Sequence, residues 1–354
     1  MSKLFSSLKI RNIEFKNRIM VSPMCQYSSV DGMPNDWHLV HLGSRAVGGA
    51  GLVMTEATAV SPEGRITPDD AGIWNDKHAE AYKRITDFIK SQNAVPGIQI
   101  AHAGRKASTY SPWKGNGALS EQDGRWQTLA ASPLPFNDDY TDPKQMNLDD
   151  IKKVADQFKS AAARAVESGF AVIELHMAHG YLVHEFLSPL SNKRKDDYGG
   201  SIENRCRIAI EIAHAVRSAI PDGMPLFVRI SSTDWVDNGW DIEQSVYLAK
   251  QLKETGVDLI DSSSGGNIAK AKIPAEPGYQ VQFADRIKKE ASILTGAVGL
   301  ITLPEQAEQI VVSGQADMVV IGRAFLRNPY WALDAARKLH TDVEWAKQYL
   351  RAKI

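Results

Sequence analysis

Two histidines three positions apart are the residues of this chain best suited to chemistry. They stand in the run Glu174-Leu175-His176-Met177-Ala178-His179-Gly180-Tyr181, which continues an apolar stretch typical of a buried strand. Residues three apart in a strand point to opposite faces, so His176 and His179 share a face only if the chain turns helically after Leu175. Such a turn would place the two imidazoles side by side, with Tyr181 close behind.

Three interpretations of this pair are open. Histidines at this spacing are often purely structural, and His38 and His41 repeat the spacing inside an ordinary helical pattern. As metal ligands, the pair would need a further histidine or carboxylate, and Glu174 is the adjacent candidate. As a pair of hydrogen-bond donors, they would hold a substrate oxygen, with Tyr181 as the proton donor.

Other residues with chemical potential also follow apolar runs. The first run ends in Ser22-Pro23-Met24-Cys25-Gln26-Tyr27, where Pro23 lacks the N–H that a strand ladder needs. Cys25 is either a small buried apolar residue or a thiol beside a polar cofactor. Arg229 interrupts the apolar run 226–230, so its charge must be paired or must face a polar ligand.

Eight short apolar runs alternate with longer amphipathic stretches, and these elements must position the residues above. The predicted strands are 18–22, 52–57, 95–100, 171–175, 225–230, 257–261, 292–297 and 318–321, and the predicted helices are 36–47, 76–91, 148–168, 203–220, 241–255, 280–290 and 303–313. This alternation predicts a parallel sheet, either closed or open. An open dinucleotide-binding fold would carry G-x-G-x-x-G after its first strand, and the chain has neither that pattern nor a P-loop.

We therefore predict the α/β class, as a single (β/α)8 TIM barrel over residues 1–354 with residues 1–17 as a hairpin across its bottom. Segments 101–147 and 177–202 exceed the usual βα loop of about 2–6 residues. Both follow strands, so we expect them to be folded lids at the C-terminal mouth, where barrel active sites are built. We also expect Glu174 to help hold Arg229 inside the barrel, which requires both side chains on one side of its wall.

A phosphate-binding pattern follows the last two strands. One runs into Gly296-Ala297-Val298-Gly299, and the other into Gly322-Arg323-Ala324, which opens a helix. Barrels often hold phosphate in the loops after strands 7 and 8, with backbone N–H groups and a helix N-terminus. Arg323 can add a forked, charge-assisted contact. The alternative is that Gly299 and Gly322 only make tight turns.

The composition excludes several classes of protein. Lys+Arg 41 against Asp+Glu 42 gives a net charge of −1, without the basic balance of a nucleic-acid or membrane-surface protein. Two cysteines, Cys25 and Cys206, are too few for a disulfide framework, a four-Cys zinc site or a usual iron–sulfur cluster. With no signal-peptide pattern and no apolar run of about 18 residues, we expect a cytoplasmic protein.

The chain resembles the old yellow enzyme family of FMN-dependent ene-reductases over nearly its whole length. The matching segments are SPMCQY (22–27), GLVMTEATAVSPEGR (51–65), GIQIAHAGRK (97–106), ELHMAHGYLVHEFLSPLSNKRKDDYGGSIENR (174–205) and GRAFLRNP (322–329). Many relatives have Thr where this chain has Cys25. In this respect the chain resembles the branch that contains bacterial NADPH dehydrogenases and xenobiotic reductase A.

The resemblance implies roles for the matching residues. Non-covalent FMN would be bound by Ser22, Pro23, Met24, Cys25, Ala57, Gln99, Arg229, Gly299, Gly322 and Arg323. Cys25 would lie near the reactive edge of the flavin, Gln99 would bond its pyrimidine, and Arg229 would stabilise the reduced anion. Gly299, Gly322 and Arg323 would hold the phosphate. The substrate would contact Tyr27, His176, His179, Tyr181 and, from a neighbouring subunit, Arg351.

The implied reaction is reduction of an activated alkene, either an α,β-unsaturated carbonyl compound or a nitro compound. Hydride would pass from NADPH to the flavin and then to the alkene in ping-pong order. His176 and His179 would stabilise the developing enolate, and Tyr181, protonated at neutral pH with an ordinary pKa of about 10, would supply the proton. The resemblance further implies a homo-oligomer, a dimer or tetramer, and a role in detoxification.

Other functions make different demands on the chain. A metal-dependent barrel hydrolase would use His176 and His179 as ligands, and predicts a bound metal and no need for Arg323. Dienoyl-CoA reductases and amine dehydrogenases of the same superfamily require a cluster and a further domain, for which this chain lacks the cysteines and the length. A role as a non-catalytic binding protein would not explain the histidine pair, Tyr181 and the phosphate loops.

Overall fold

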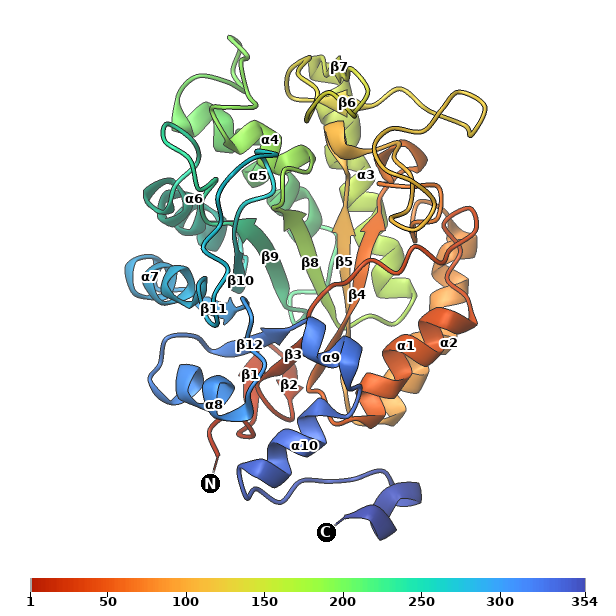
Figure 1. The fold of residues 1–354 in the computed structure, drawn as a ribbon, viewed down its shortest axis with the longest axis vertical. Coiled ribbons are helices and arrows are strands. Elements are labelled where there is room, and N and C mark those ends of the chain that lie inside the picture. The colour runs from red at the N-terminus through yellow and green to blue at the C-terminus, as the bar shows by residue number, and fades with distance from the viewer. Residues whose placement is uncertain (1, 354) are drawn as a thin grey trace.

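Eight apolar runs form parallel strands that close into a barrel (Figure 1). The structure, a computed structural model, describes residues 2–353. The barrel strands are β3 (Ile19–Val21), β4 (Leu52–Ala59), β5 (Val95–Ala101), β8 (Val172–Met177), β9 (Leu226–Ser231), β10 (Leu259–Ser263), β11 (Leu294–Ala297) and β12 (Met318–Ile321). They follow chain order around the barrel, and β3 pairs with β12 to close it. The predicted (β/α)8 barrel is confirmed.

Seven helices cover the outside of the barrel, and each was predicted from the sequence. They are α1 (Asp36–Val47), α2 (Asp76–Ser91), α3 (Leu148–Glu167), α5 (Ile202–Arg217), α6 (Ile242–Glu254), α7 (Val281–Ala291) and α8 (Pro304–Val312). Polar side chains at the N-caps of five of them accept a backbone N–H from the first turn, which fixes where these helices begin: Asn35, Asn75, Asn147, Ser201 and Asp241.

Shorter elements complete the chain. Helix α9 (Arg323–Arg327) opens after Gly322 as predicted, whereas α4 (Leu182–Leu187) and α10 (Trp331–Lys338) were not predicted. The 3-10 turns are η1 (Pro62–Gly64), η2 (Gly104–Lys106) and η3 (Lys347–Ala352). No helix in the described part of the chain is both long enough and apolar enough to cross a membrane.

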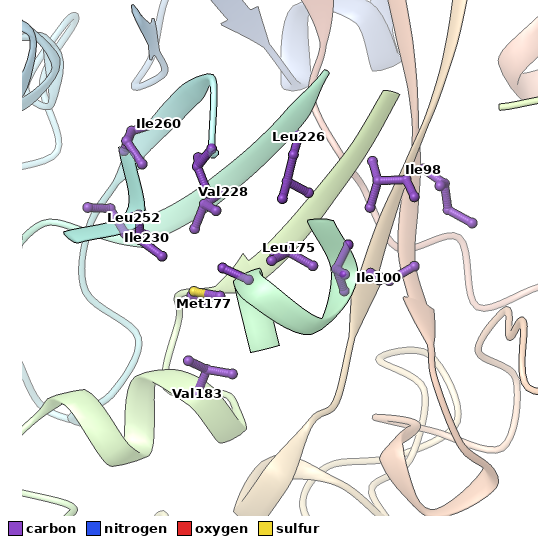
Figure 2. Packing of buried hydrophobic residues seen from close by; sticks show 14 of the residues in the cluster. Ile98, Ile100, Leu175, Met177, Val183, Leu226, Val228, Ile230, Leu252 and Ile260 are labelled. Atoms are coloured by element: carbon purple, nitrogen blue, oxygen red, sulfur yellow. The ribbon is translucent and has the colours of Figure 1, made fainter. Parts of the chain in front are cut away.

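Alternation along the strands separates the apolar core from the barrel interior. In β9, Leu226, Val228 and Ile230 belong to the large cluster between barrel and helices, as Figure 2 shows, and Leu252 of α6 is part of the same cluster. The residues between them, Phe227 and Arg229, therefore face the barrel interior. This pattern makes the wall apolar outside and leaves interior positions near the strand ends free for polar side chains.

The bottom of the barrel is filled by a second apolar cluster. The antiparallel hairpin of β1 (Leu8–Ile10) and β2 (Ile13–Phe15) contributes Ile10 and Phe15 to it. Its remaining fully or almost fully buried members come from the barrel strands: Met20, Leu52, Met54, Val172, Phe227, Leu259, Met318 and Val320. The hairpin predicted for residues 1–17 is confirmed, and it closes the end of the barrel opposite the mouth.

Both long segments predicted as lids are folded. Segment 101–147 carries η2 and the small parallel pair β6 (Leu129–Ala130) and β7 (Lys144–Gln145). Segment 177–202 carries α4, whose residues are all buried. In Figure 1 these elements lie together beyond the C-terminal ends of β4, β5 and β8, so they border the mouth of the barrel.

Candidate active site

Strand register brings the predicted site residues together inside the barrel. Gln99 of β5 is the partner of both Ala57 on β4 and Glu174 on β8. One pleat further toward the mouth, Arg229 of β9 is the partner of both His176 on β8 and Asp261 on β10. Residues paired in this way point to the same face of a sheet, so these side chains share the barrel interior.

The partners of Arg229 differ from those expected. Its Nη1 donates to Ser22 Oγ (3.2 Å), and its Nε lies 3.3 Å from Asp261 Oδ2. Glu174 instead accepts a hydrogen bond of 2.8 Å from Gln99 Nε2. The expectation that Glu174 and Arg229 lie on the same side of the barrel wall is correct. The direct ion pair of Arg229, however, is with Asp261, because β10 lies beside β9 and carries a carboxylate in register.

The two carboxyl groups and the guanidinium share one buried environment. Burial, followed by repulsion from Asp261, raises the pKa of Glu174 to about 8, while Arg229 opposes the shift. Burial also raises the pKa of Asp261, again against the effect of Arg229. Glu174 therefore keeps its proton at neutral pH, while the positive charge of Arg229 favours the ionised form of Asp261.

The histidine pair lies at the end of β8. The Nδ1 atom of His179 is 3.3 Å from Nε2 of His176, and the ring centroids are 5.1 Å apart. The expected helical turn after Leu175 is wrong, since β8 runs to Met177 and the chain then turns through left-handed backbone at His179 and Gly180 (φ 59° and 72°). This left-handed turn, and not a helical one, brings the two rings to one face.

Both imidazoles are neutral. Burial lowers the pKa of His176 and of His179 well below the ordinary range, and the charge of Arg229 lowers both further. His179 Nε2 is 2.7 Å from Ser263 Oγ, and its backbone N–H donates to Ser231 Oγ (2.9 Å). A neutral ring offers one N–H, so the pair can donate to an acceptor but does not bring positive charge to it.

Tyr181 packs against the pair with its proton in place. Its ring meets His176 edge-on, with centroids 5.0 Å apart. Burial raises the pKa of Tyr181 well above its ordinary range, and Cys25 and Tyr27 raise it further, so the phenol is protonated at neutral pH. Lys106, whose pKa burial lowers to about 8, places its Nζ 5.1 Å from the centre of the Tyr181 ring.

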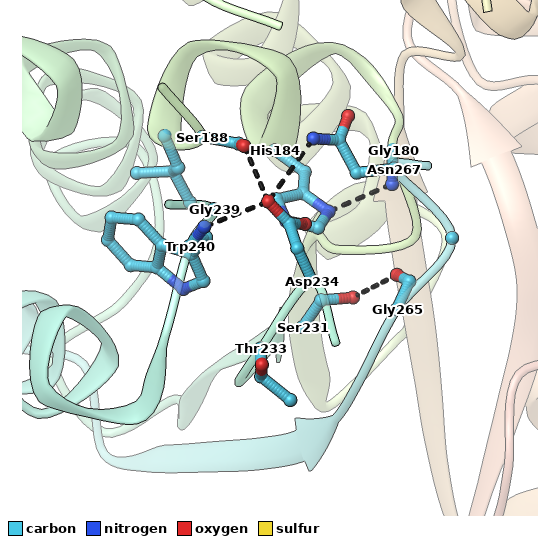
Figure 3. A network of polar contacts seen from close by, with 12 residues as sticks. Gly180, His184, Ser188, Ser231, Thr233, Asp234, Gly239, Trp240, Gly265 and Asn267 are labelled. Atoms are coloured by element: carbon cyan, nitrogen blue, oxygen red, sulfur yellow. Dashed lines mark hydrogen bonds and ion pairs between the residues drawn. The ribbon is translucent and has the colours of Figure 1, made fainter. Parts of the chain in front are cut away.

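A buried polar network holds the turn that carries His179 and Tyr181 (Figure 3). The Gly180 N–H donates to Nδ1 of His184 (2.9 Å), and Nε2 of His184 lies 3.1 Å from Asp234 Oδ1. The other oxygen of Asp234 accepts from Ser188 Oγ (2.5 Å) and from the Trp240 N–H (2.9 Å). His184 and Asp234 are fully buried, so the groups that hold this turn have no access to solvent.

The segment after β3 carries Cys25 and Tyr27 to the same mouth. Glu56 Oε2 accepts the N–H of Gln26 (2.9 Å), and Glu56 Oε1 lies 3.1 Å from His38 Nε2. Burial raises the pKa of Cys25 well above its ordinary range, so the thiol is protonated. Burial likewise raises the pKa of Tyr27, whose backbone is left-handed (φ 46°).

The residues predicted to bind phosphate gather at the ends of β11 and β12, which are paired in the sheet. Gly299 has a φ of 128°, a conformation that side chains rarely adopt. Gly322 lies against the end of β3, since a Cβ added there would be 3.6 Å from Met24 Sδ and 3.7 Å from Ser22 Cβ. Arg323 is the first residue of α9 and is exposed.

Arg351 is apart from all of these residues. It is exposed on η3, and the preceding segment 344–348 lines a cavity of about 250 Å³ with Lys16 and Asn93, at the barrel bottom. The C-terminus accordingly lies at the far end of the molecule from the lids (Figure 1). Any active site that Arg351 reaches must therefore belong to a second copy of the chain, and that role stays a prediction.

The geometry offers little to the metal interpretation of the histidine pair. His176 Nδ1 accepts the N–H of Ala178 (3.1 Å), and His179 Nε2 faces a serine. Across residues 2–353, no group of three His, Cys, Asp or Glu side chains is placed to hold a metal ion. The pair therefore lies at the edge of a polar interior, without the ligand set of a metal site among the described residues.

Several residues of this site were missed from the sequence. They are Asp261, Ser231, Ser263, Lys106, His184 and Asp234. Three of them had a usable signal, because Asp261, Ser263 and Ser231 are polar residues at the mouth ends of apolar strands, as His176 and Arg229 are. Lys106, His184 and Asp234 lie in or next to lid segments, whose positions depend on loop closure and carry no periodic pattern.

A closed barrel with buried donors and a neutral histidine pair at its mouth defines a TIM-barrel enzyme that binds a polar, partly anionic ligand. The chain belongs to the NADH:flavin oxidoreductase / NADH oxidase family, whose sequence profile matches residues 3–342. It is accordingly an FMN-dependent oxidoreductase of the old yellow enzyme type, which oxidises a reduced nicotinamide nucleotide.

Individual relatives agree with this assignment. A protein named NADPH dehydrogenase from Bacillus subtilis (strain 168) is 48% identical over 351 residues, covering 99% of this chain and 98% of the relative. One of the same name from Geobacillus sp. (strain WCH70) is 49% identical over 350 residues, covering 98% of each. The solved structure of an old yellow enzyme homologue from Zymomonas mobilis superposes with a TM-score of 0.79 at 25% identity, covering 97% of this chain and 94% of that one.

The polar atoms at the mouth fit a flavin. Among residues 2–353, Glu174 Oε2 and Asp261 Oδ1 are buried without a hydrogen-bond partner, and Arg229 Nε and Asp261 Oδ2 have only their ion pair with each other. Unpaired buried polar atoms are costly, and a ligand with donors and acceptors along one edge would relieve that cost. The pyrimidine edge of an isoalloxazine ring has this character. A phosphate would suit the backbone N–H groups at the start of α9, which have no acceptor within that helix.

Proposed function

We propose that this chain is an NADPH-dependent ene-reductase that reduces the C=C bond of α,β-unsaturated carbonyl compounds. The observation that carries the proposal is the pair of neutral imidazoles, His176 and His179, whose facing nitrogens are 3.3 Å apart. Two N–H donors at that separation can converge on one carbonyl oxygen and stabilise the negative charge that develops on it. Nitro groups also present such an oxygen and are included as substrates.

We assign FMN binding to the residues around Arg229. Its guanidinium would hold the pyrimidine edge together with Gln99, while Ser22, Pro23, Met24, Cys25 and Ala57 would line the ring. Gly299, Gly322 and Arg323 would hold the phosphate at the ends of β11 and β12. When bound, FMN supplies hydride transfer, taking a hydride from NADPH and delivering it to the substrate in turn. The fixed positive charge of Arg229 favours an electron-rich flavin.

Tyr181 would donate a proton to the α-carbon of the substrate. Its raised pKa keeps the phenol protonated over the whole neutral range, which is the state a general acid needs. His176, in edge contact with its ring, would orient the substrate oxygen beside it. Tyr27 would contact the substrate as well.

The relatives' names and the cysteines support the remaining assignments. NADPH as the reductant follows the name shared by the Bacillus and Geobacillus proteins. A cytoplasmic location suits Cys25 and Cys206, which are both free thiols. We also propose one FMN-binding domain over residues 1–354, and a homo-oligomer in which Arg351 reaches the mouth of a neighbouring subunit.

An anaerobic spectral titration tests the proposal. We expect the purified protein to show flavin absorption that bleaches with NADPH and returns when cyclohexenone is added, with cyclohexanone as the product. Saturated cyclohexanone, which has no C=C bond, serves as the matched control and should leave the spectrum bleached. Bleaching without recovery by any enone would refute the substrate class, and a colourless protein that FMN does not alter would refute the cofactor.

A further inference from the structure

The ring of His176 is held in one tautomer by its own backbone. The Ala178 N–H donates to Nδ1 of His176 (3.1 Å), so this nitrogen carries a lone pair. Because the ring is neutral, its single proton lies on Nε2. The same Nε2 atom faces His179, at 3.3 Å from its Nδ1.

The ring of His179 is compatible with either tautomer. With its proton on Nε2, it donates to Ser263 Oγ (2.7 Å), and its Nδ1 accepts from His176. Both rings are then occupied by protein partners. With its proton on Nδ1, the Ser263 hydroxyl donates to Nε2 instead, and the N–H groups of His176 and His179 both face the space between them. The two states differ in which nitrogen of His179 carries the proton and, as a result, in the direction of its hydrogen bond with Ser263.

Ser263 is suited to support both states because a hydroxyl donates as well as accepts. It is 4% exposed, and within residues 2–353 the only hydrogen-bond partner of its Oγ is His179 Nε2. Ser231, its register partner on β9, instead fixes the backbone, accepting the His179 N–H and donating to Gly265 O (2.8 Å). Ser231 thus binds the His179 backbone, while Ser263 forms a hydrogen bond with its ring.

We propose that Ser263 is a positioning residue that donates to His179 Nε2 when a substrate oxygen is bound, so that His179 presents Nδ1–H beside the Nε2–H of His176. The inference rests on the proposed function, because it assigns an oxygen ligand to the histidine pair. Without that ligand, both tautomers of His179 are populated, and in the Nε2–H state His176 donates to His179 Nδ1. The hydrogen bond from Ser263 thereby replaces the hydrogen bond between the two histidines with two N–H groups that can donate to a substrate oxygen. Neither ring has to move.

Nuclear magnetic resonance of holoenzyme labelled with 15N-histidine tests this assignment, because protonated and unprotonated ring nitrogens resonate far apart. Loss of signals in His179→Asn identifies His179 among the nine histidines. Spectra are recorded with oxidised flavin, with and without cyclohexenone; NADPH is omitted, so nothing turns over. We expect wild-type His179 to contain both tautomers and to shift to Nδ1–H with cyclohexenone. In Ser263→Ala, we expect it to stay Nε2–H in both samples.

The same variants are titrated with cyclohexenone. Ser263→Ala should bind it about tenfold more weakly, the loss expected for one hydrogen bond. Ser263→Cys replaces the hydroxyl with a thiol, a weak donor of similar size. Its affinity for cyclohexenone should lie between those of wild type and Ser263→Ala, and it replaces Ser263→Ala in the test if that variant does not fold. Ser262→Ala is the matched control, since Ser262 is a fully buried serine of the same strand whose hydroxyl has no partner in the described chain.

The outcomes separate this inference from the proposed function. Identical His179 tautomers and cyclohexenone affinities in wild type and Ser263→Ala would overturn the role of Ser263, even if enones are reduced. If the wild-type enzyme does not bind cyclohexenone, the proposed function fails. The ligand-free spectra then decide about Ser263, because Nδ1–H in the wild type and its loss in Ser263→Ala require the hydroxyl.

Discussion

The Nε2 atom of His184 lies 3.1 Å from Oδ1 of Asp234, and neither side chain is exposed. The other nitrogen of the same ring accepts the Gly180 N–H, so the imidazole joins the turn after β8 to the loop after β9. Through this link, Asp234 supports the turn at Gly180, between His179 and Tyr181. The structure of the mouth therefore depends on a polar contact that is fully buried.

Replacing this carboxylate should destabilise the whole protein. In Asp234→Ala, the partners His184, Ser188 and the Trp240 N–H would lose a buried acceptor, and breaking a buried pair of this kind costs about 3–5 kcal/mol. We expect a clearly lower urea midpoint. Asp237→Ala, at an exposed position of the same loop, should change the free energy of unfolding by no more than about 0.5 kcal/mol. Equal midpoints for the two variants would contradict this role of Asp234.

Gly180 should tolerate no side chain, for two separable reasons. Its backbone is left-handed (φ 72°), and an added Cβ would overlap the carbonyl oxygen of Gly266. Gly200 shares the left-handed backbone (φ 80°) but has nothing within 4 Å of an added Cβ. Gly200→Ala should thus show only the backbone cost of about 1–2 kcal/mol. Gly180→Ala should be less stable and lower kcat/KM for cyclohexenone on the order of a hundredfold, because the histidines shift.

If Gly180→Ala were as stable and as active as Gly200→Ala, the close approach of the two loops would not be needed. Thermal melting and steady-state kinetics of the two purified variants provide both comparisons. Flavin absorption of each sample shows whether the cofactor is still bound.

The buried carboxyl of Glu174 should make stability depend on pH with a definite sign. Its pKa is about 8 in the folded protein against an ordinary 4.5, so between these values the folded state binds one more proton than the unfolded chain. The free energy of unfolding therefore falls as the pH rises through this window, by at most about 1.4 kcal/mol per pH unit. Glu174→Gln keeps a hydrogen-bonding amide at this position and removes the titration.

We therefore expect Glu174→Gln to gain in melting temperature relative to wild type as the pH is raised from about 5 to about 8. The exposed Glu276→Gln serves as the control and should follow the wild-type profile. A difference between Glu174→Gln and wild type that does not change with pH would mean that Glu174 is ionised throughout the window.

Tyr181→Phe should separate the two halves of the proposed reaction. Removing a general acid typically slows its step by a factor of about 100 or more. In stopped-flow experiments, we expect NADPH to bleach the flavin at a rate within the wild-type range, while recovery with cyclohexenone slows strongly. Tyr198→Phe, which removes a surface hydroxyl bonded to Glu211, should leave both rates unchanged. Unaltered recovery in Tyr181→Phe would remove Tyr181 from the mechanism.

The sequence was informative wherever local pattern decides the structure. Each of the eight barrel strands is an apolar run, and the polar residues at or near strand ends, such as Gln99, His176 and Arg229, do face the interior. Alternation alone determines that orientation, so it could be predicted without knowing the partners. The roles assigned to these residues through family resemblance stay predictions, and the experiments above test several of them.

The partners themselves depend on geometry that one sequence does not contain. Arg229 pairs with Asp261 because β9 and β10 are in register at these positions, and a carboxylate on either neighbouring strand was compatible with the sequence. His179 adopts a left-handed backbone, which is uncommon for a residue other than glycine, and a neighbouring chain segment holds it there. Lys106 donates to His179 O (2.9 Å) and to Gly266 O (3.1 Å), and these contacts depend on how segments far apart in the sequence pack together.

In the part of the chain that the structure describes, the N-terminal hairpin closes the bottom of the barrel with an apolar cluster, and the polar interior opens toward the mouth. Ile10 and Phe15 belong to the cluster that fills the lower barrel, so nothing can reach Arg229 or Glu174 from below. For the proposed reaction, the electron donor and the alkene must therefore take turns at one opening. If the proposed reaction holds, each reactant in excess would compete with the other for this opening.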